Sequence, residues 1–316
     1  MKTNFLYILI ILAFLAGCSS GPVKPIDTDY LTEAVPAGFQ QHTFFKTEGL
    51  GTFCAVPGEN SIVFSSKHNS SNYNLYLKNL NDDKLTLLTN EPGDETFPAV
   101  SPSGKVLAFC SNNEERWSLN VMNLASGMNT PLSLISNVES ELISPAWSPD
   151  GKKMVFSRFS AELEDYEICI LDIEAAGSRN PKAALHFTGC IGLFPKWSPK
   201  DENIIAFQKA NQIGENWFGL YIYDIMRERT IELVSDPRWA AINPSWSDDG
   251  KFIAFSAVNK SGSSNNIWAY EIDNSKLYQL TTGSESNYQP VWRKDRVLFC
   301  RTINGVTNIW SLKPEF

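Results

Sequence analysis

Few residues in this chain have the side chains and the spacing that acid–base, nucleophilic or metal chemistry requires. The three histidines, His42, His68 and His186, are far apart, and neither a Gly-x-Ser-x-Gly nor a His-Glu-x-x-His motif is present. Acidic residues such as Asp150 lie in Ser-Pro-Asp-Gly-like segments, which are typical of tight turns. The sequence therefore predicts a protein that is not an enzyme, with no catalytic residue, no cofactor and no metal site.

A tandem repeat organises the chain and must position whatever site it has. The signature is Pro-x-Trp-Ser, and its prolines, 46 to 50 residues apart, are Pro98, Pro145, Pro195, Pro244 and Pro290. The first and the last of these are weaker copies. Each signature is followed by a turn, an apolar run and further runs with the two-residue alternation of β-strands. Four short strands in a unit of this length are typical of a propeller blade.

The number of repeats and the closure of the ring follow from the two ends of the repeat region. A degenerate first copy can be aligned through Phe64, which matches Phe109, and this makes six copies. The sixth copy has room for only three strands, whereas the segment 41–47 reads as a strand before the first copy. Pairing that segment with the last blade leaves no open sheet edge. We therefore expect an all-β, six-bladed β-propeller of four-stranded antiparallel blades, with the last blade closed by the N-terminal strand.

In such a propeller the residues just before each repeat proline should face one mouth of the central channel. Four of them are aromatic, and exposed aromatic clusters often mark binding sites. The predicted partner-binding residues at this channel mouth are Phe53, Phe97, Phe194, Asn243 and Tyr288. The alternative is that the rings pack between blades as core, because half of the residues in any strand point inward.

Five cysteines remain when Cys18 is set aside, and an odd number cannot all pair within one chain. Cys110 and Cys300 occupy a repeat position that holds serine in other copies, for example Ser157, so we expect them to be small packing residues. The cysteine spacings match no zinc-binding pattern.

The N-terminus carries a candidate modification site. Lys2 is followed by an apolar stretch, 5–15, which is typical of a secretory signal and short of the about 20 apolar residues that a transmembrane helix needs. The stretch ends in Leu-Ala-Gly-Cys, which resembles the lipobox of bacterial lipoproteins. That resemblance implies acylation of Cys18, with palmitate among the chains, and firm membrane anchoring. An ordinary signal peptide with an incidental cysteine is the alternative.

These features divide the chain into three parts: a lipoprotein signal peptide (1–17), the lipidated cysteine with a flexible tether (18–39), and the propeller (40–316). The tether is inferred from its prolines and glycines and its lack of periodicity. Ser19 follows the cysteine where an aspartate would favour retention in the inner membrane of a Gram-negative cell. The lipoprotein resemblance thus implies a place at the outer membrane, facing the periplasm.

The segment 145–157, Pro-Ala-Trp-Ser-Pro-Asp-Gly-Lys-Lys-Met-Val-Phe-Ser, closely resembles the WD40-like repeat of the TolB-type propeller. The resemblance covers roughly residues 50–316. This chain differs from TolB in two respects. Only the short tether precedes the propeller, where TolB has an α/β domain, and the segment 293–296 replaces the usual turn of the sixth repeat. The resemblance implies the six-bladed architecture and a protein-binding role in the cell envelope.

The formal net charge of −8 argues against nucleic acid as a partner. The sequence thus predicts a non-catalytic, lipid-anchored envelope propeller that binds a protein partner. One alternative is a protein that binds a glycan or a peptidoglycan fragment through the aromatic residues. A hydrolase or lyase centred on the channel is a further alternative, and it would need carboxylates that converge on the axis.

Overall fold

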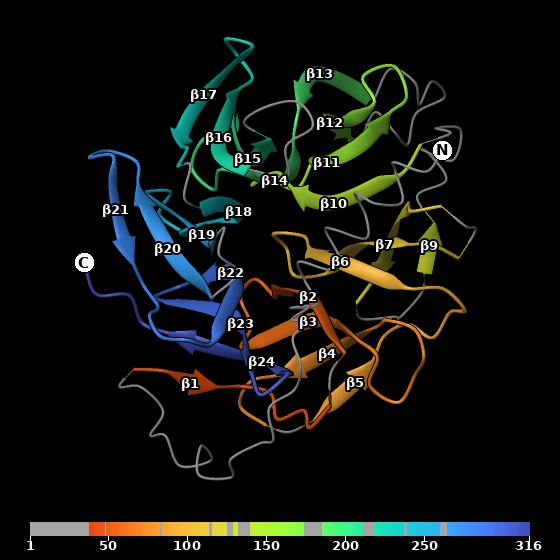
Figure 1. Cartoon of the computed structure of the whole chain (residues 1–316). Coiled ribbons are helices and arrows are strands. Elements are labelled where there is room, and N and C mark those ends of the chain that lie inside the picture. Colours follow the sequence, from red (N-terminus) through yellow and green to blue (C-terminus); the bar gives the residue numbers. More distant parts are fainter. Residues whose placement is uncertain are drawn as a thin grey trace.

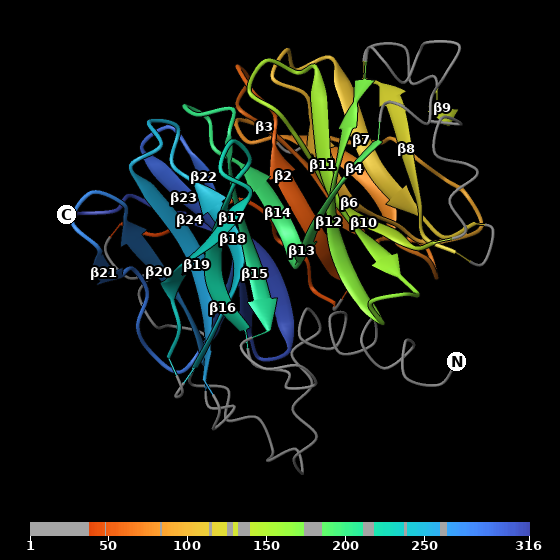
Figure 2. The same cartoon turned by 90° about the horizontal axis from the view of Figure 1, so that it is seen from above.

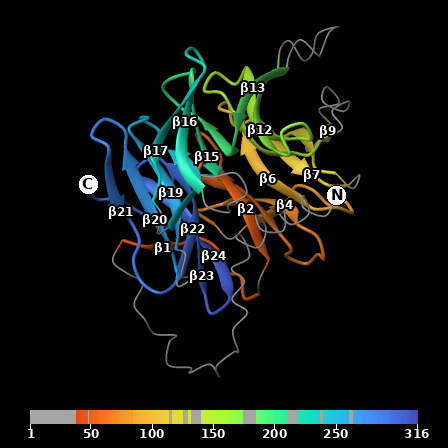
Figure 3. The same cartoon turned by 45° about the horizontal axis from the view of Figure 1, so that its top comes forward.

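The computed structural model describes residues 38–47, 49–82, 84–113, 116–124, 129–131, 140–173, 185–210, 218–236, 239–259 and 264–316. Over these residues the chain forms six four-stranded antiparallel sheets that surround a central axis as the blades of a propeller (Figure 1). Figures 2 and 3 show the same ring of blades from two further directions. The expected six-bladed all-β architecture is confirmed.

Each blade is built from four strands that run in order from the axis outward. The inner strands are β2 (Leu50–Ala55), β6 (Glu95–Val100), β10 (Leu142–Trp147), β14 (Leu193–Trp197), β18 (Trp239–Trp246) and β22 (Ser286–Arg293). The second strands are β3 (Ser61–Ser66), β7 (Val106–Ser111), β11 (Lys153–Ser160), β15 (Ile204–Ala210), β19 (Phe252–Asn259) and β23 (Arg296–Ile303).

The two outer positions of the blades are filled in the same order. The third strands are β4 (Asn74–Asn79), β8 (Ser118–Asn123), β12 (Asp165–Asp172), β16 (Phe218–Asp224), β20 (Asn265–Glu271) and β24 (Val306–Leu312). The outermost strands are β5 (Leu85–Leu87), β9 (Asn129–Pro131), β13 (Leu185–Ile191), β17 (Arg229–Val234), β21 (Lys276–Gln279) and, in the sixth blade, β1 (Gln40–Gln41).

One phenylalanine at the same position of every second strand forms the centre of each blade's packing. These six rings are almost completely buried, and they are Phe64, Phe109, Phe156, Phe207, Phe255 and Phe299. Burying a side chain of this size stabilises the fold by about 1.5–3 kcal/mol. The alignment of the degenerate first repeat through Phe64 is therefore confirmed, because Phe64 and Phe109 occupy equivalent places.

The turn between the inner and second strands explains why serine and aspartate recur in the repeat. In the third blade Ser148 Oγ donates to Asp150 Oδ1 at 2.6 Å, and the backbone N–H of Lys153 donates to Ser148 Oγ at 2.9 Å. Gly151 closes the turn at a φ of 73°, which favours glycine. The bond from Ser148 holds the pKa of Asp150 below its usual value. Asp150 therefore acts as a turn residue, as the sequence indicated.

The sixth blade is closed by residues from the N-terminal side, which lie beside β24 in Figures 1 and 3. The ladder is shorter than the expected strand 41–47, because β1 pairs with β24 only through Gln40 and Gln41. Beyond it, the His42 N–H still donates to the carbonyl of Ile309 at 2.8 Å. The expected closure of the last blade by an N-terminal strand is confirmed. The expected length of that strand, 41–47, is wrong.

Side chains take over where this ladder ends. Asn308 Oδ1 accepts from Thr43 Oγ1 at 3.0 Å and from the Phe45 N–H at 2.7 Å, and Asn308 Nδ2 donates to the Phe45 carbonyl at 3.3 Å. Thr43 Oγ1 also accepts from the Ile309 N–H at 2.8 Å. We call the contacts of residues 40–45 with β24 the clasp.

His42 lies within the clasp, away from the channel. Its Nε2 is 2.8 Å from Ser311 Oγ, and the side chain is buried. Burial, together with the charges of Arg296 and Arg293, lowers the pKa of His42 to about 4. The ring is therefore neutral at neutral pH, and it serves the closure of the blade.

We predict that Asn308→Ala weakens the clasp and lowers the stability of the whole propeller. The substitution removes three hydrogen bonds, and each bond contributes about 0.5–1.5 kcal/mol net, so the loss should be about 2–4 kcal/mol. Chemical denaturation of the purified protein measures it. Asn266→Ala is the matched control, because Asn266 holds the same strand position in the fifth blade and accepts one bond, from Thr281. Equal losses in the two variants would contradict a special role for the clasp.

Candidate functional site

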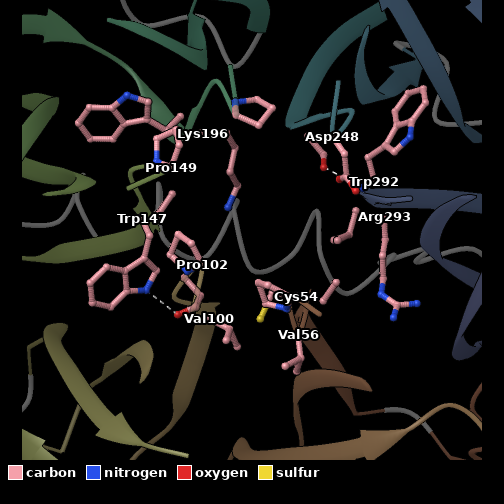
Figure 4. A pocket seen from close by; sticks show the side chains of 18 of the residues that line it. Cys54, Val56, Val100, Pro102, Trp147, Pro149, Lys196, Asp248, Trp292 and Arg293 are labelled. Carbon is pink, nitrogen blue, oxygen red and sulfur yellow. Dashed lines mark hydrogen bonds between the residues drawn. The ribbon is translucent and has the colours of Figure 1, made fainter. Parts of the chain in front are cut away.

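The central channel is lined by the inner strands, and its lining changes from one end to the other. At the end where the inner strands turn into the second strands, the channel widens into a cavity of about 530 Å³, which we call the funnel (Figure 4). The residue after each repeat proline lines its wall. In five blades these residues are Ala99, Ala146, Lys196, Ser245 and Val291; in the first blade, where Phe53 stands at the proline position, the equivalent residue is Cys54.

The rim of the funnel is formed by the turn that follows each inner strand. Four blades place a proline there: Pro57, Pro102, Pro149 and Pro199. In the fifth and sixth blades Asp248 and Lys294 line the rim, and the Lys294 N–H donates to Asp248 Oδ2 at 3.1 Å. Most of the rim is therefore rigid and apolar, because proline has a fixed φ and no N–H.

The opposite end of the funnel is nearly closed by the residues before the repeat prolines, which we call the floor. The floor encloses a second cavity of only about 50 Å³. In five blades these residues are Phe97, Ser144, Phe194, Asn243 and Gln289, and the first blade contributes Thr52 and Phe53. The rings of Phe97 and Phe194 meet edge to face with their centroids 5.8 Å apart. The described channel is therefore much narrower at the floor than at the funnel.

The five residues predicted to bind a partner are all buried. Phe53, Phe97, Phe194 and Asn243 lie in the floor, and Tyr288 lies between blades, with its hydroxyl 3.2 Å from Thr307 Oγ1. The expected exposed aromatic rim is not what the structure has, and packing of the rings as core, the alternative, describes them better. A partner-binding role for these residues stays a prediction, confined to the bottom of the recess.

The difference arises from a bulge in each inner strand, which changes the alternation of its side chains. The strand register shifts just before every repeat proline, and the residues there with positive φ are Phe97, Ser144, Phe194, Asn243 and Gln289. Non-glycine residues with positive φ are uncommon, and for bulky ones the conformation is strained. The bulge turns the residue before the proline toward the axis, and the residue before that one, such as Tyr288, into the gap between blades.

Each bulge leaves a backbone N–H outside the ladder of its own blade. In several blades a side chain of the preceding blade accepts a hydrogen bond from this N–H. The Gln289 N–H donates to Ser256 Oγ at 2.8 Å, and the Asn243 N–H donates to Gln208 Oε1 at 2.8 Å. Sequence reasoning assigned this column of residues to packing alone. The sequence did carry a signal for the hydrogen-bonding role. Polar side chains recur at the position directly after the buried phenylalanine of the second strands, which lies in the core.

The funnel contains one charged side chain on its wall, Lys196. It is half-buried, and burial lowers the pKa of its amine. Figure 4 shows the amine pointing into the open middle of the funnel. Sequence reasoning missed this residue, although the signal was present, because Lys196 is the only charged residue at the x position of the Pro-x-Trp repeats.

The titratable groups do not gather into a reactive cluster. In the described part of the chain, no three His, Cys, Asp or Glu side chains are placed to hold a metal ion. The five described cysteines are free thiols, and burial raises the pKa of Cys54 to about 12. His186 lies in the outer strand β13, on the other side of its blade from the channel.

The predicted lipidation site, Cys18, lies outside the described residues, as does the predicted signal peptide. Among the residues that the structure describes, none belongs to a helix that is long and apolar enough to cross a membrane.

Comparison with known families and structures agrees with this geometry. The family described as the TolB beta propeller domain matches residues 127–315, which is more than half of the chain. A search of curated proteins finds no match in sequence.

Solved structures of similar fold come from differently named proteins. TolB from Acinetobacter baumannii has a TM-score of 0.60 and 18% identity over 82% of this chain, which spans 65% of that protein's length. An oligogalacturonate lyase from Vibrio parahaemolyticus has a TM-score of 0.61 and 13% identity, with 88% of this chain and 94% of that chain covered. The β-propeller domain of the Trilobed protease from Pyrococcus furiosus has a TM-score of 0.56 and 18% identity, with 85% and 84% covered. Identities this low show a shared fold alone.

We predict that Ser256→Ala destabilises the propeller by about 1–3 kcal/mol, because it leaves the buried Gln289 N–H without an acceptor. Ser157→Ala is the matched control: it occupies the same position in the third blade, is equally buried, and its Oγ has no hydrogen-bond partner among the described residues. Denaturant titration of both variants measures the difference. A loss as large for Ser157→Ala would show that the column acts through packing and not through the bulge.

Proposed function

The chain belongs to the family of TolB beta propeller domains, and from that premise we propose that it is a non-catalytic cell-envelope protein that binds an extended segment of a partner protein in the funnel. The observation that carries the proposal is the shape of the channel. A recess of about 530 Å³ opens at one end and is nearly closed by the floor at the other. A rigid, mostly apolar recess that narrows inward and has a few polar groups suits a bound ligand.

The size of the funnel supports a segment of chain as the ligand. A cavity of about 530 Å³ falls in the ordinary range for ligand pockets, about 300–1,000 Å³, which admits a few side chains and not a folded domain. The proline rim adds apolar contact at little entropic cost, because its backbone is already constrained. Phe53, Phe97, Phe194 and Asn243 would then limit how deeply the segment enters.

The acidic residues around the channel support binding over catalysis. A hydrolase or lyase in this place would use a pair of positioned acid and base groups. In the described lining of the funnel and the floor cavity the one carboxylate is Asp248, and it accepts a bond from the Lys294 N–H.

A glycan is the second candidate ligand. Trp147, Trp197 and Trp292 line the funnel, and flat aromatic faces can also contact sugar rings. The protein ligand is preferred, because three of these indoles already donate their N–H to backbone carbonyls and the prolines offer few donors to sugar hydroxyls.

The lipid anchor is a separate part of the proposal. The motif Leu15-Ala16-Gly17-Cys18 supports acylation of Cys18 and a place at the outer membrane, facing the periplasm. We predict that the mature protein begins at an acylated Cys18 and that Cys18→Ser moves it from the membrane fraction to the soluble fraction. Mass spectrometry of the N-terminal peptide and fractionation of the two proteins measure this. An unmodified cysteine in the membrane-bound protein would contradict it.

The binding site can be mapped with a photo-crosslinking amino acid placed at single positions in the living cell. We expect a crosslink to one envelope protein when the label replaces Pro149 at the rim of the funnel, and none when it replaces Lys276 on the outer strand β21. Both positions are exposed, so solvent access does not distinguish them.

Two outcomes would change the assignment. A protein crosslink at Lys276 and not at Pro149 would move the site from the funnel to the blade edges. The second outcome favours a glycan as the ligand. In that case no protein crosslinks, the protein binds envelope glycan, and the Ala146→Trp substitution, which fills the funnel, weakens this binding.

A further inference from the structure

The funnel wall is neutral except at one position, and that exception is in the fourth blade. Five of the six blades place a small or neutral residue at this wall position: Cys54, Ala99, Ala146, Ser245 and Val291. The fourth blade places Lys196 there, in β14 opposite Ala206 of β15. Lys196 also borders the floor cavity, and its amine points into the open middle of the funnel (Figure 4).

The ammonium group of Lys196 forms no ion pair with a carboxylate in the part of the chain that the structure describes, although Asp248 lines the same funnel. No hydrogen bond is found there for its Nζ either, and the titratable group that influences the pKa of its amine is Cys54, across the funnel. Burial keeps that thiol protonated, since its pKa is raised to about 12. A partly buried charge without a partner is unfavourable, and buried charges in proteins are normally paired.

The walls around the amine restrict what can pair with it. Pro102, Pro149 and Pro199 supply no N–H groups, and the Arg293 guanidinium is bonded to Asn60 and Glu59 of the first blade. A phosphate group is usually held by several N–H donors or an arginine fork. One amine in an apolar recess suits an anion with a single charge.

We propose that Lys196 binds one carboxylate of the segment that enters the funnel, either an acidic side chain or the carboxyl end of a chain. The inference rests on the proposed function and deepens it, because it assigns the chemistry of the group at the tip of the ligand. The carboxylate pairs with the ammonium in the middle of the funnel, and the residues before it contact the proline rim. The site distinguishes ligands by their charge, because a ligand without a carboxylate would leave the Lys196 ammonium buried and unpaired.

Small probes test this without knowledge of the partner. The ¹⁵N-labelled full chain is titrated with N-acetylglutamic acid amide, which carries a side-chain carboxylate, and with N-acetylalanine, which carries a terminal one. N-acetylglutamine amide is the uncharged control. The indole N–H signals of Trp147, Trp197 and Trp292, which line the funnel, report binding by NMR. The carboxylate probe that binds more tightly identifies the source of the group.

We expect a carboxylate probe to bind with a Kd in the millimolar range or below and the uncharged probe to bind at least about tenfold more weakly. Lys196→Met should weaken the carboxylate probe by about tenfold or more, because it removes one member of the charge pair. Lys276→Met is the matched control, since it makes the same substitution on an exposed outer strand. Its affinity should equal that of the unsubstituted protein.

Equal affinity for the charged and uncharged probes, no binding of either carboxylate, or an unchanged affinity in Lys196→Met would each overturn the inference. The photo-crosslink at position 149 separates this failure from that of the proposed function. If Lys196→Met retains the crosslink and the probes do not bind, the funnel still binds a partner by other contacts. If the probes bind through Lys196 and no protein crosslinks at the funnel, the anion site stands and the protein-binding proposal fails.

Discussion

The bulge before each repeat proline is the constraint on which the rest of the molecule depends. It places a residue with positive φ at the axis in five blades, and its exposed N–H is taken up by the preceding blade where Ser256 or Gln208 lies opposite. The same local feature therefore joins neighbouring blades and directs side chains into the channel. Without it the inner strands would alternate regularly, and the floor could not form from these residues.

Much of the fold could be predicted from the sequence because its causes are local and repeated. The prolines, the tryptophans and the buried phenylalanines recur at a fixed period, and the Ser148–Asp150 turn is visible in the order of residues. The closure of the ring followed from counting strands. Its extent did not, because Asn308 ends the ladder with side-chain bonds that no strand pattern reveals.

The candidate site was harder to predict than the fold. Tyr288 and Gln289 are one step apart in the bulge, so the sequence could not show which of the two faces the axis. Burial of the aromatic residues depends on how six blades fill a common centre, which is a property of the whole ring. Lys196 was visible as an irregularity of the repeat. That it is the one charged residue of the funnel wall became clear only when the structure placed the other five wall residues around it.

The clasp also fixes when the ring can be completed. His42 and Ser311, which meet in it, are 269 residues apart in the chain. At a synthesis rate of about 5–20 residues per second, the first of them exists for about ten seconds or more before its partner is made. During this interval the first blades can assemble, since their contacts are local. The residues that will form β1 must stay unpaired, and the growing ring keeps an open edge that is a hazard for pairing with other chains. Closure of the ring therefore cannot precede the synthesis of β24.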